Sequence, residues 1–341
     1  MPQPFAIVSC AKINLSLDIV GLRADGYHEL RSVVHTLALH DTLSFEFGGG
    51  GWRLSCDDPE LETPGNLCLK AARAWAELAR ANGLSGPLGG DISLRKRIPH
   101  GAGLGGGSGN AWAVLEALSR AYDPEGKRIP RPELQALAKT VGADVPLFAR
   151  GGALLLEGIG ERLEPLPSLL GWAVLAQPSA RVSTPQAFRS WDATQEPSGA
   201  MTPALLQAWR GIGAPENPQA QQERLSLVAG RLGNDLRRAA RALGVPVEAG
   251  IESLRQAGAL GAEMTGSGSA VFGLCRDEGH ARQVQAAASE SLNARQPGEW
   301  QLWRAPLCNY GARLELETAS STSSTCEGTM SLNAVEGEDG K

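Results

Sequence analysis

Polar and apolar residues alternate without a break in one short stretch near the start of the chain. Between residues 12 and 19 the sequence reads KINLSLDI, with isoleucine or leucine at every second position and polar residues between them. A period of two places successive side chains on opposite faces of a β-strand, so this stretch predicts a strand with one apolar and one polar face. Lys12 and Asn14 share the polar face. For two such residues alone, the simplest interpretation is a face turned toward water.

The same patterns predict a β-rich beginning and a mixed remainder. Strand-like runs occupy residues 30–39, 42–47, 52–56, 92–98, 153–157, 162–166, 172–176 and 270–275. Helical periodicity follows Asn66 as far as Gly83, resumes at Ala111, and runs from Pro132 to Gly142. Further helices are expected to start near residues 182–185 and 233–236. Residues 193–220, rich in proline, glycine and glutamine, predict a loop.

A glycine-rich segment joins the strand that Pro99 ends to the helix that contains Ala111. It runs from Gly101 to Gly109 and opens the helix, where free backbone N–H groups and the positive end of the helix dipole favour a bound anion. Glycines let the backbone approach a phosphate closely, and Ser108 adds a hydroxyl that can reach a phosphate oxygen or its Mg²⁺. A flexible connector is the alternative.

Two other phosphate-binding loops do not match this segment. A P-loop needs a Lys-Ser or Lys-Thr pair after its last glycine, and here Gly107 is followed by Ser108 and Gly109. The dinucleotide fingerprint can be forced onto residues 101–106, but no βαβ start with a later acidic residue supports it.

Composition narrows the class of protein. The 341 residues suffice for two domains, with a border expected at Gly151 and Gly152, and 42% hydrophobic with 20% charged residues is typical of a globular protein. The net charge of −5 argues against a nucleic-acid binder, and no apolar run approaches the length of a membrane helix.

Six cysteines without regular spacing predict neither a disulfide framework nor a zinc site. The first ten residues lack a secretion signal, so a cytoplasmic protein is expected.

Several motifs together resemble one family. Residues 99–111, PHGAGLGGGSGNA, are similar to the ATP-phosphate loop of the GHMP kinases, a superfamily of small-molecule kinases, and residues 264–272, MTGSGSAVF, are similar to its second glycine-rich motif. Within the superfamily, the triple glycine and the segments AKINL, DGYHEL and GADVP most resemble the kinases of 4-diphosphocytidyl-2-C-methyl-D-erythritol.

The resemblance covers residues 6–316 and implies an α+β fold of two domains. The first is an N-terminal β/α domain like that of ribosomal protein S5, over residues 1–152, and the second is a ferredoxin-like domain over residues 153–317. Residues 318–341, rich in serine, threonine and acidic residues, predict a disordered tail.

The resemblance also assigns residues to ATP, with Mg²⁺ as the accompanying ion and no protein ligand assigned to the metal. The ATP residues are Asn66, Lys96, Pro99, His100, Gly101, Ala102, Gly103, Leu104, Gly105, Gly106, Gly107, Ser108 and Gly109. Gly109 stands where the family usually has a second serine. The backbone cradle is therefore expected here without a hydroxyl at that position.

The acceptor site and the catalytic pair are implied in the same way. Tyr27 is expected to stack on the cytosine, His28 to hydrogen-bond its edge and Phe188 to close its other side, while Asn14 contacts the substrate. Asp144 is expected to accept or orient the hydroxyl proton, with Lys12 beside it. The place of Asp144 directly ahead of a Val-Pro pair equally suggests a helix N-cap, and Asp144 can have both roles.

The implied activity is transfer of the γ-phosphoryl group of ATP to the 2-hydroxyl of 4-diphosphocytidyl-2-C-methyl-D-erythritol, in the non-mevalonate route to isoprenoid precursors. Two alternatives stay open: another kinase of the same superfamily, and a nucleotide-binding regulator that kept the fold and lost catalysis. The expected partner is the small-molecule substrate, with neither nucleic acid nor membrane. The expected assembly is a monomer or a weak homodimer.

Overall fold

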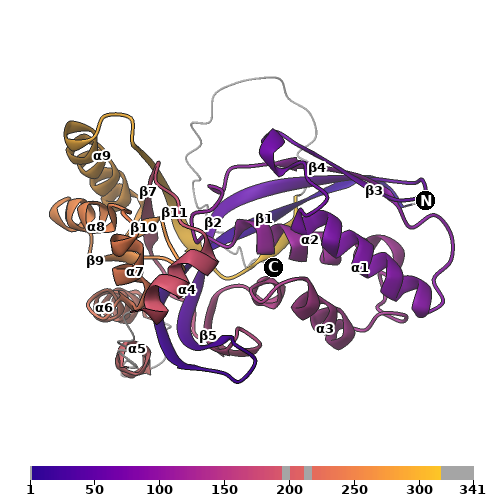
Figure 1. Ribbon diagram of the computed structural model, residues 1–341, viewed down its shortest axis with the longest axis horizontal. Helices are drawn as coiled ribbons and strands as arrows, with labels where there is room; N and C mark the ends of the chain where they lie inside the picture. Colours follow the sequence, from indigo (N-terminus) through magenta and orange to yellow (C-terminus); the bar gives the residue numbers. More distant parts are fainter. Residues whose placement is uncertain (1, 194–199, 211–216, 316–341) are drawn as a thin grey trace, which may run out of the picture.

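The computed structural model describes residues 2–193, 200–210 and 217–315. Strands and helices are mixed throughout these residues, which confirms the α+β class. In Figure 1 the first half of the chain forms one side of the molecule and the second half the other, and two long strands extend through both. The predicted tail at 318–341 lies outside the described residues.

These two strands are β1, Phe5–Leu22, and β2, His28–Phe47, which pair antiparallel along their length. The predicted strand over residues 12–19 is the middle of β1. Its polar face is not turned toward water, however, because Lys12 and Asn14 are each 5% exposed and Ser16 and Asp18 are fully buried. A solvated face, the interpretation of these two residues taken alone, is therefore wrong, because elements from the second half of the chain cover this face. The site roles that the resemblance implies for Lys12 and Asn14 stay predictions. The two strands predicted over residues 30–47 are one strand, since pairing to β1 continues between them.

Three helices and two strands complete the first half. They are β3, Trp52–Cys56; α1, Leu67–Ala81; β4, Gly90–Arg95; α2, Gly106–Tyr122; and α3, Arg131–Val141, with short 3₁₀ turns at Pro59–Leu61 (η1) and Val145–Ala149 (η2). The helices pack against the sheet around a core that includes Phe45, Trp75, Trp112 and Phe148. Strand β4 ends three residues before Ile98, where the predicted strand ended. Helix α2 begins inside the glycine run, five residues before Ala111.

The second half continues the sheet and adds helices along it. Its elements are β5, Ala153–Gly158; β6, Arg162–Leu166; β7, Trp172–Pro178; α4, Thr184–Asp192; α5, Met201–Arg210; α6, Pro218–Ala229; β8, Gly233–Asn234; α7, Leu236–Ala242; α8, Val247–Gln256; β9, Gly261–Met264; β10, Val271–Cys275; α9, Glu278–Arg295; β11, Trp300–Cys308; and β12, Ala312–Leu314. The main strand order is β12-β1-β2-β11-β7-β10-β9. Strand β5 pairs with β2, so the sheet continues past Gly151 and Gly152, and the division into two domains stays a prediction.

The predicted loop over residues 193–220 was wrong for its described part, because α5 and the start of α6 lie there. Proline is compatible with the first turn of a helix, where its missing N–H has no acceptor, and Pro218 begins α6 in that way. Leu205 and Trp209, one turn apart in α5, are buried. Among the described residues, no helix combines the length and the apolar character that crossing a membrane requires.

Candidate active site

One cavity of about 1070 Å³ brings together nearly all the residues singled out in the sequence. Its lining includes Lys12, Asn14, Tyr27, His28, Asn66, Lys96, Pro99, His100, Gly101, Ala102, Gly103, Leu104, Gly105, Gly106, Gly107, Ser108, Asp144 and Phe188. Gly109 is not in this lining. A Cβ atom there would lie 2.9 Å from the carbonyl oxygen of Cys10 and from Oγ of Ser9, so the position faces β1.

The glycine segment forms an open helix start at the cavity. Gly103 and Gly105 have φ angles of 76° and 71°, which favour glycine, and Gly105 is the N-cap of α2 without a side-chain cap. The first intrahelical bond runs from the N–H of Gly109 to the carbonyl of Gly105, at 2.9 Å. The N–H groups of Gly106, Gly107 and Ser108 therefore have no acceptor within the helix and can bind an anion.

Two of these glycines allow close approaches that a side chain would block. A Cβ atom on Gly105 would lie 2.9 Å from Cγ of Lys12, so the lysine chain passes directly over this residue. A Cβ atom on Gly103 would lie 2.4 Å from the carbonyl oxygen of Thr265, and one on Gly266 would lie 2.9 Å from that of Gly103. The two glycine-rich turns, which are 162 residues apart at Gly103 and Thr265, thus pack closely against each other.

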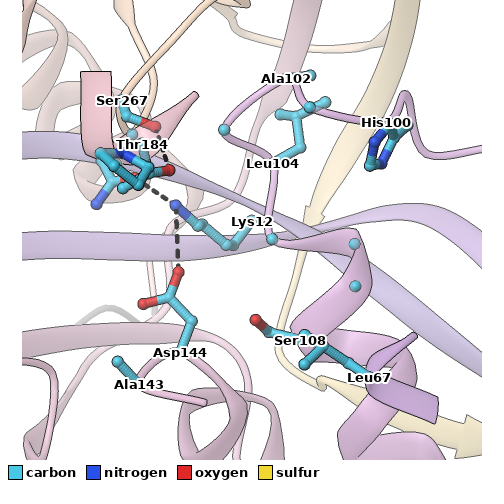
Figure 2. Close-up of a pocket in the computed structure, with 18 of the residues that line it drawn as sticks. Lys12, Leu67, His100, Ala102, Leu104, Ser108, Ala143, Asp144, Thr184 and Ser267 are labelled. Atoms are coloured by element: carbon cyan, nitrogen blue, oxygen red, sulfur yellow. Dashed lines mark hydrogen bonds and ion pairs between the residues drawn. The ribbon is translucent and has the colours of Figure 1, made fainter. Parts of the chain in front are cut away.

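Lys12 and Asp144 meet beside this helix start. Nζ of Lys12 lies 3.8 Å from Oδ2 of Asp144, and the side chains are 6% and 40% exposed. Figure 2 shows Lys12 extended toward Asp144 on one side, with Thr184 and Ser267 beyond its tip. Burial lowers the pKa of Lys12 below its usual range, and the charge of Asp144 acts in the opposite direction.

The position of Asp144 is compatible with both of its predicted roles, the helix N-cap and the residue beside Lys12. It occupies the N-cap position of η2, as its spacing suggested, but its side chain makes no cap hydrogen bond. The carboxylate instead extends toward Lys12 and lines the cavity.

Asn14 holds Lys12 and is itself held by the protein. Nζ of Lys12 donates to Oδ1 of Asn14 at 2.6 Å, and Nδ2 of Asn14 donates to Oγ of Ser32 at 2.8 Å. The backbone N–H of Asn14 donates to Oγ1 of Thr265 at 3.0 Å. Ser32 was not singled out in the sequence. Strand pairing brings it close to Asn14, and the sequence gives no register for that pairing.

Lys96 also has a partner that the sequence did not indicate. It forms an ion pair with Asp41, which is fully buried and accepts the backbone N–H groups of Arg97 and Ile98 at 2.7 and 2.8 Å. Nδ2 of Asn110 adds a fourth contact at 3.0 Å. Asp41 therefore fixes the end of β4 and the start of α2 relative to each other.

Asn66 caps α1, as its place before the helix predicted. Its Oδ1 accepts the N–H of Cys68 at 2.8 Å, and its Nδ2 donates to the carbonyl of Leu61 at 2.9 Å. It also lines the cavity, so a contact with a nucleotide stays compatible with its cap role.

Aromatic side chains gather at another part of the cavity. His28 stacks on Phe188 with ring centroids 4.7 Å apart and meets the edge of Trp191 at 5.5 Å. Tyr27 is 62% exposed and makes no ring contact with Phe188 among the described residues. Tyr27 and Phe188 are therefore not a packed pair that a flat ligand between them would have to separate, but His28 already covers part of the Phe188 ring.

Two polar residues on α4 lie at this end and were not predicted. Oδ1 of Asp192 lies 2.6 Å from Nε2 of His28. Arg189 lines the cavity, and within the described part of the chain no hydrogen bond or ion pair engages its guanidinium. Asp192 lies one helical turn after Phe188, so a helical projection of 184–192 would have indicated it. Arg189 directly follows Phe188, and no helical spacing marks it.

Comparison with known proteins gives consistent matches. Residues 66–152 match the GHMP kinases N terminal domain, and residues 221–294 match GHMP kinases C terminal. The chain is 36% identical to the 4-diphosphocytidyl-2-C-methyl-D-erythritol kinase of Acetivibrio thermocellus, over 81% of this chain and 92% of that protein. It is 39% identical to the protein of the same name from Deinococcus radiodurans, over 85% and 89%.

Solved structures agree with these matches. A crystal structure of 4-(cytidine 5'-diphospho)-2C-methyl-D-erythritol kinase superposes with a TM-score of 0.69 at 32% identity, covering 89% of this chain and 98% of that one. Homoserine kinase from Cytophaga hutchinsonii superposes with a TM-score of 0.68 at 19% identity, covering 92% and 98%. The second likeness concerns the fold alone.

Proposed function

The chain belongs to the family of 4-diphosphocytidyl-2-C-methyl-D-erythritol kinases within the GHMP kinases, and on this basis we propose how its residues carry out the reaction. The activity is ATP-dependent phosphorylation of 4-diphosphocytidyl-2-C-methyl-D-erythritol in the non-mevalonate isoprenoid pathway. The observation that carries the proposed mechanism is one cavity whose lining contains Lys12 and Asp144 together with the glycine-lined helix start and the aromatic side chains.

In this proposal the ATP phosphates lie over residues 101–108. The open N–H groups at the start of α2 bind phosphate oxygens, and Lys96, Pro99, His100 and Asn66 lie along the rest of the nucleotide site. Phosphoryl transfer needs mainly positioning and electrostatic stabilisation, which a rigid backbone cradle supplies. Gly109 contributes to the helix backbone and not through a side chain.

Asp144 would accept or orient the proton of the acceptor hydroxyl, for which its partly exposed carboxylate is suitably placed. Lys12 would neutralise charge on the attacking oxygen and on the transferred group. Asn14 keeps the ammonium group in place, since its Oδ1 accepts a hydrogen bond from it at 2.6 Å. Any contact of Asn14 with the substrate would add to this role.

The cytidine end of the acceptor would occupy the aromatic part of the cavity, with Tyr27 and Phe188 on the base and His28 at its edge. The adjoining diphosphate needs a cation. Arg189 lies beside Phe188, and no described residue neutralises it. A guanidinium group can bind phosphate through two parallel hydrogen bonds, so we assign Arg189 to this diphosphate.

The residues present also fit Mg²⁺. No group of three or more histidine, cysteine or acidic side chains that could hold a metal occurs among the described residues, so phosphate oxygens and water would supply most ligands. Ser108 and Asp144 are the lining residues that would hold it, and bound Mg²⁺ would neutralise phosphate charge.

The cellular location and the oligomeric state of the protein are also part of this proposal. We place it in the cytoplasm, where ATP is available, as a monomer or a weak homodimer without nucleic-acid or membrane partners. Light scattering over a range of protein concentrations tests the assembly.

The decisive experiment measures ADP release with ATP, Mg²⁺ and the cytidine acceptor, beside mevalonate, homoserine and galactose. Turnover confined to the cytidine acceptor, and reduced at least about a thousandfold by Asp144→Asn, is expected. Asp91→Asn is the matched control, because Asp91 pairs with Arg53 outside the cavity. ATP binding without turnover of any acceptor would refute the proposal.

A further inference from the structure

We propose that Asp192 is a positioning residue that makes the acceptor site selective for cytosine over uracil, because it holds the imidazole of His28 in one tautomer. This inference rests on the proposed function, since it concerns the base of the acceptor.

The His28 ring is held on several sides. Its Nε2 lies 2.6 Å from Oδ1 of Asp192, its face stacks on Phe188 with centroids 4.7 Å apart, and Trp191 meets it edge-on at 5.5 Å. The His28 side chain is 10% exposed, whereas that of Asp192 is 44% exposed. His28 begins β2 and Asp192 ends α4, so the contact also joins two separate elements.

The partner of Nε2 determines where the imidazole proton lies. An ionised carboxylate can only accept hydrogen bonds, so Nε2 must carry a proton and donate it to Asp192. In the neutral ring, Nδ1 is then an acceptor. Within the described part of the chain, no group hydrogen-bonds to Nδ1 of His28, and the residue lines the cavity. Its lone pair is therefore available to a ligand.

This arrangement suits one pyrimidine better than the other. Cytosine carries an amino group that donates hydrogen bonds, whereas uracil carries a carbonyl oxygen at the same position. Nδ1 as an acceptor can pair with the amino group but meets the lone pairs of the carbonyl. A site built to hydrogen-bond one group rejects the analogue that lacks it, because its own polar atom is then left unpaired.

Asp192→Asn tests this inference with little change in size. The asparagine can accept from Nε2–H through its oxygen or donate to Nε2 through its nitrogen, so both tautomers become available. We measure kcat and KM for the cytidine acceptor and for the uridine-linked analogue of the same alcohol, at mildly alkaline pH, where neutral imidazole predominates in proteins. The ratio of kcat/KM values, cytidine over uridine, is expected to fall about tenfold. The loss for the cytidine acceptor should appear mainly in KM and less in kcat, because His28 and Asp192 contact the base and not the reacting atoms.

Asp91→Asn is the matched control, and it should leave this ratio unchanged. Equal ratios for the wild type and Asp192→Asn would overturn the inference. If the wild type turned over neither acceptor, the proposed function would fail instead, so the two failures are distinguishable.

A spectroscopic readout does not depend on turnover. The chain has five histidines, so ¹⁵N spectra of the imidazoles can be assigned to His28 by comparison with His28→Gln. The wild type should show protonated Nε2 and unprotonated Nδ1, and Asp192→Asn a mixture. A wild-type spectrum with the proton on Nδ1 alone would overturn the inference even if the variant failed to fold.

Discussion

Nζ of Lys12 and Oδ2 of Asp144 lie 3.8 Å apart, yet the lysine side chain is 6% exposed and the aspartate side chain 40% exposed. Of the two side chains, that of Lys12 is therefore the one that folding buries. Burial lowers its pKa, and the attraction of Asp144 offsets only part of that effect. Burying a charge costs more free energy than one partly exposed partner returns. A gain in stability therefore does not explain the buried Lys12, which agrees with the catalytic role proposed for it.

Lys12→Met should separate these two roles. The methionine chain can follow the same path over Gly105, but it carries no charge. Turnover should fall at least about a thousandfold, because charge stabilisation in the transition state is lost. The free energy of unfolding should stay the same or rise by about 1 kcal/mol, since a buried charge is replaced by an apolar group. ADP release and urea unfolding measure the two quantities, and a marked loss of stability would contradict this view of Lys12.

Arg189→Ala should act on acceptor binding. If the guanidinium binds the diphosphate, its removal costs about 1.5–3 kcal/mol, which corresponds to a rise of about tenfold to a hundredfold in KM for the cytidine acceptor. The KM for ATP and the kcat should change little, because the reacting centre is intact. Arg282→Ala is the control, since Arg282 pairs with Glu278 on α9, away from the cavity. A rise in the KM for ATP alone would assign Arg189 to the nucleotide instead.

Asp41→Asn should be strongly destabilising. The Asp41 carboxylate accepts two backbone N–H groups and Nδ2 of Asn110, and it is the ionic partner of Lys96. An amide leaves the mostly buried lysine without its counter-charge, at a cost of about 3–5 kcal/mol in the free energy of unfolding. Asp91→Asn breaks an exposed pair and should cost less than about 1 kcal/mol. Urea unfolding of both variants makes the comparison, and equal losses would contradict it.

The sequence predicted those features that local chemistry determines. The alternation of polar and apolar residues predicted the middle of β1, and Asn66 ahead of a helical pattern predicted the N-cap of α1. The glycine run predicted the uncapped start of α2. The spacing of Asp144 ahead of a Val-Pro pair predicted its place at the start of η2. Each of these features depends on residues within a few positions of one another.

Features that depend on distant neighbours could not be predicted. The polar face of β1 resembles a solvated strand until Thr265 is known to cover Asn14. Asp41 is 55 residues from Lys96, and no local pattern marks it as the partner. The part of 193–220 with helices has the proline-rich composition of a loop, and its helix face is defined only by the burial of Leu205 and Trp209 against the rest of the protein. All three of these features depend on tertiary contacts.

His35 should make the protein less stable in mild acid. It is fully buried on β2, where Nδ1 lies 2.9 Å from the carbonyl oxygen of Thr36 and Nε2 accepts the N–H of Leu169 at 3.1 Å. Its Nδ1 must therefore donate, and the ring is neutral. Burial lowers its pKa to about 4, while the hydrogen bond to Thr36 acts in the opposite direction.

The sign of the pH dependence follows from proton binding in the two states. Below about pH 6.5 the unfolded chain protonates this histidine, whereas the folded protein does not until about pH 4, so stability falls as pH falls through this window. His35 alone should account for a loss of about 2 kcal/mol between about pH 7 and pH 5. His40, whose pKa burial also lowers to about 4, adds to the slope of the whole protein. Urea unfolding at both pH values should therefore show a smaller loss for His35→Gln than for the wild type, because glutamine can make similar hydrogen bonds without titrating. Equal losses in the two proteins would show that His35 does not produce the effect.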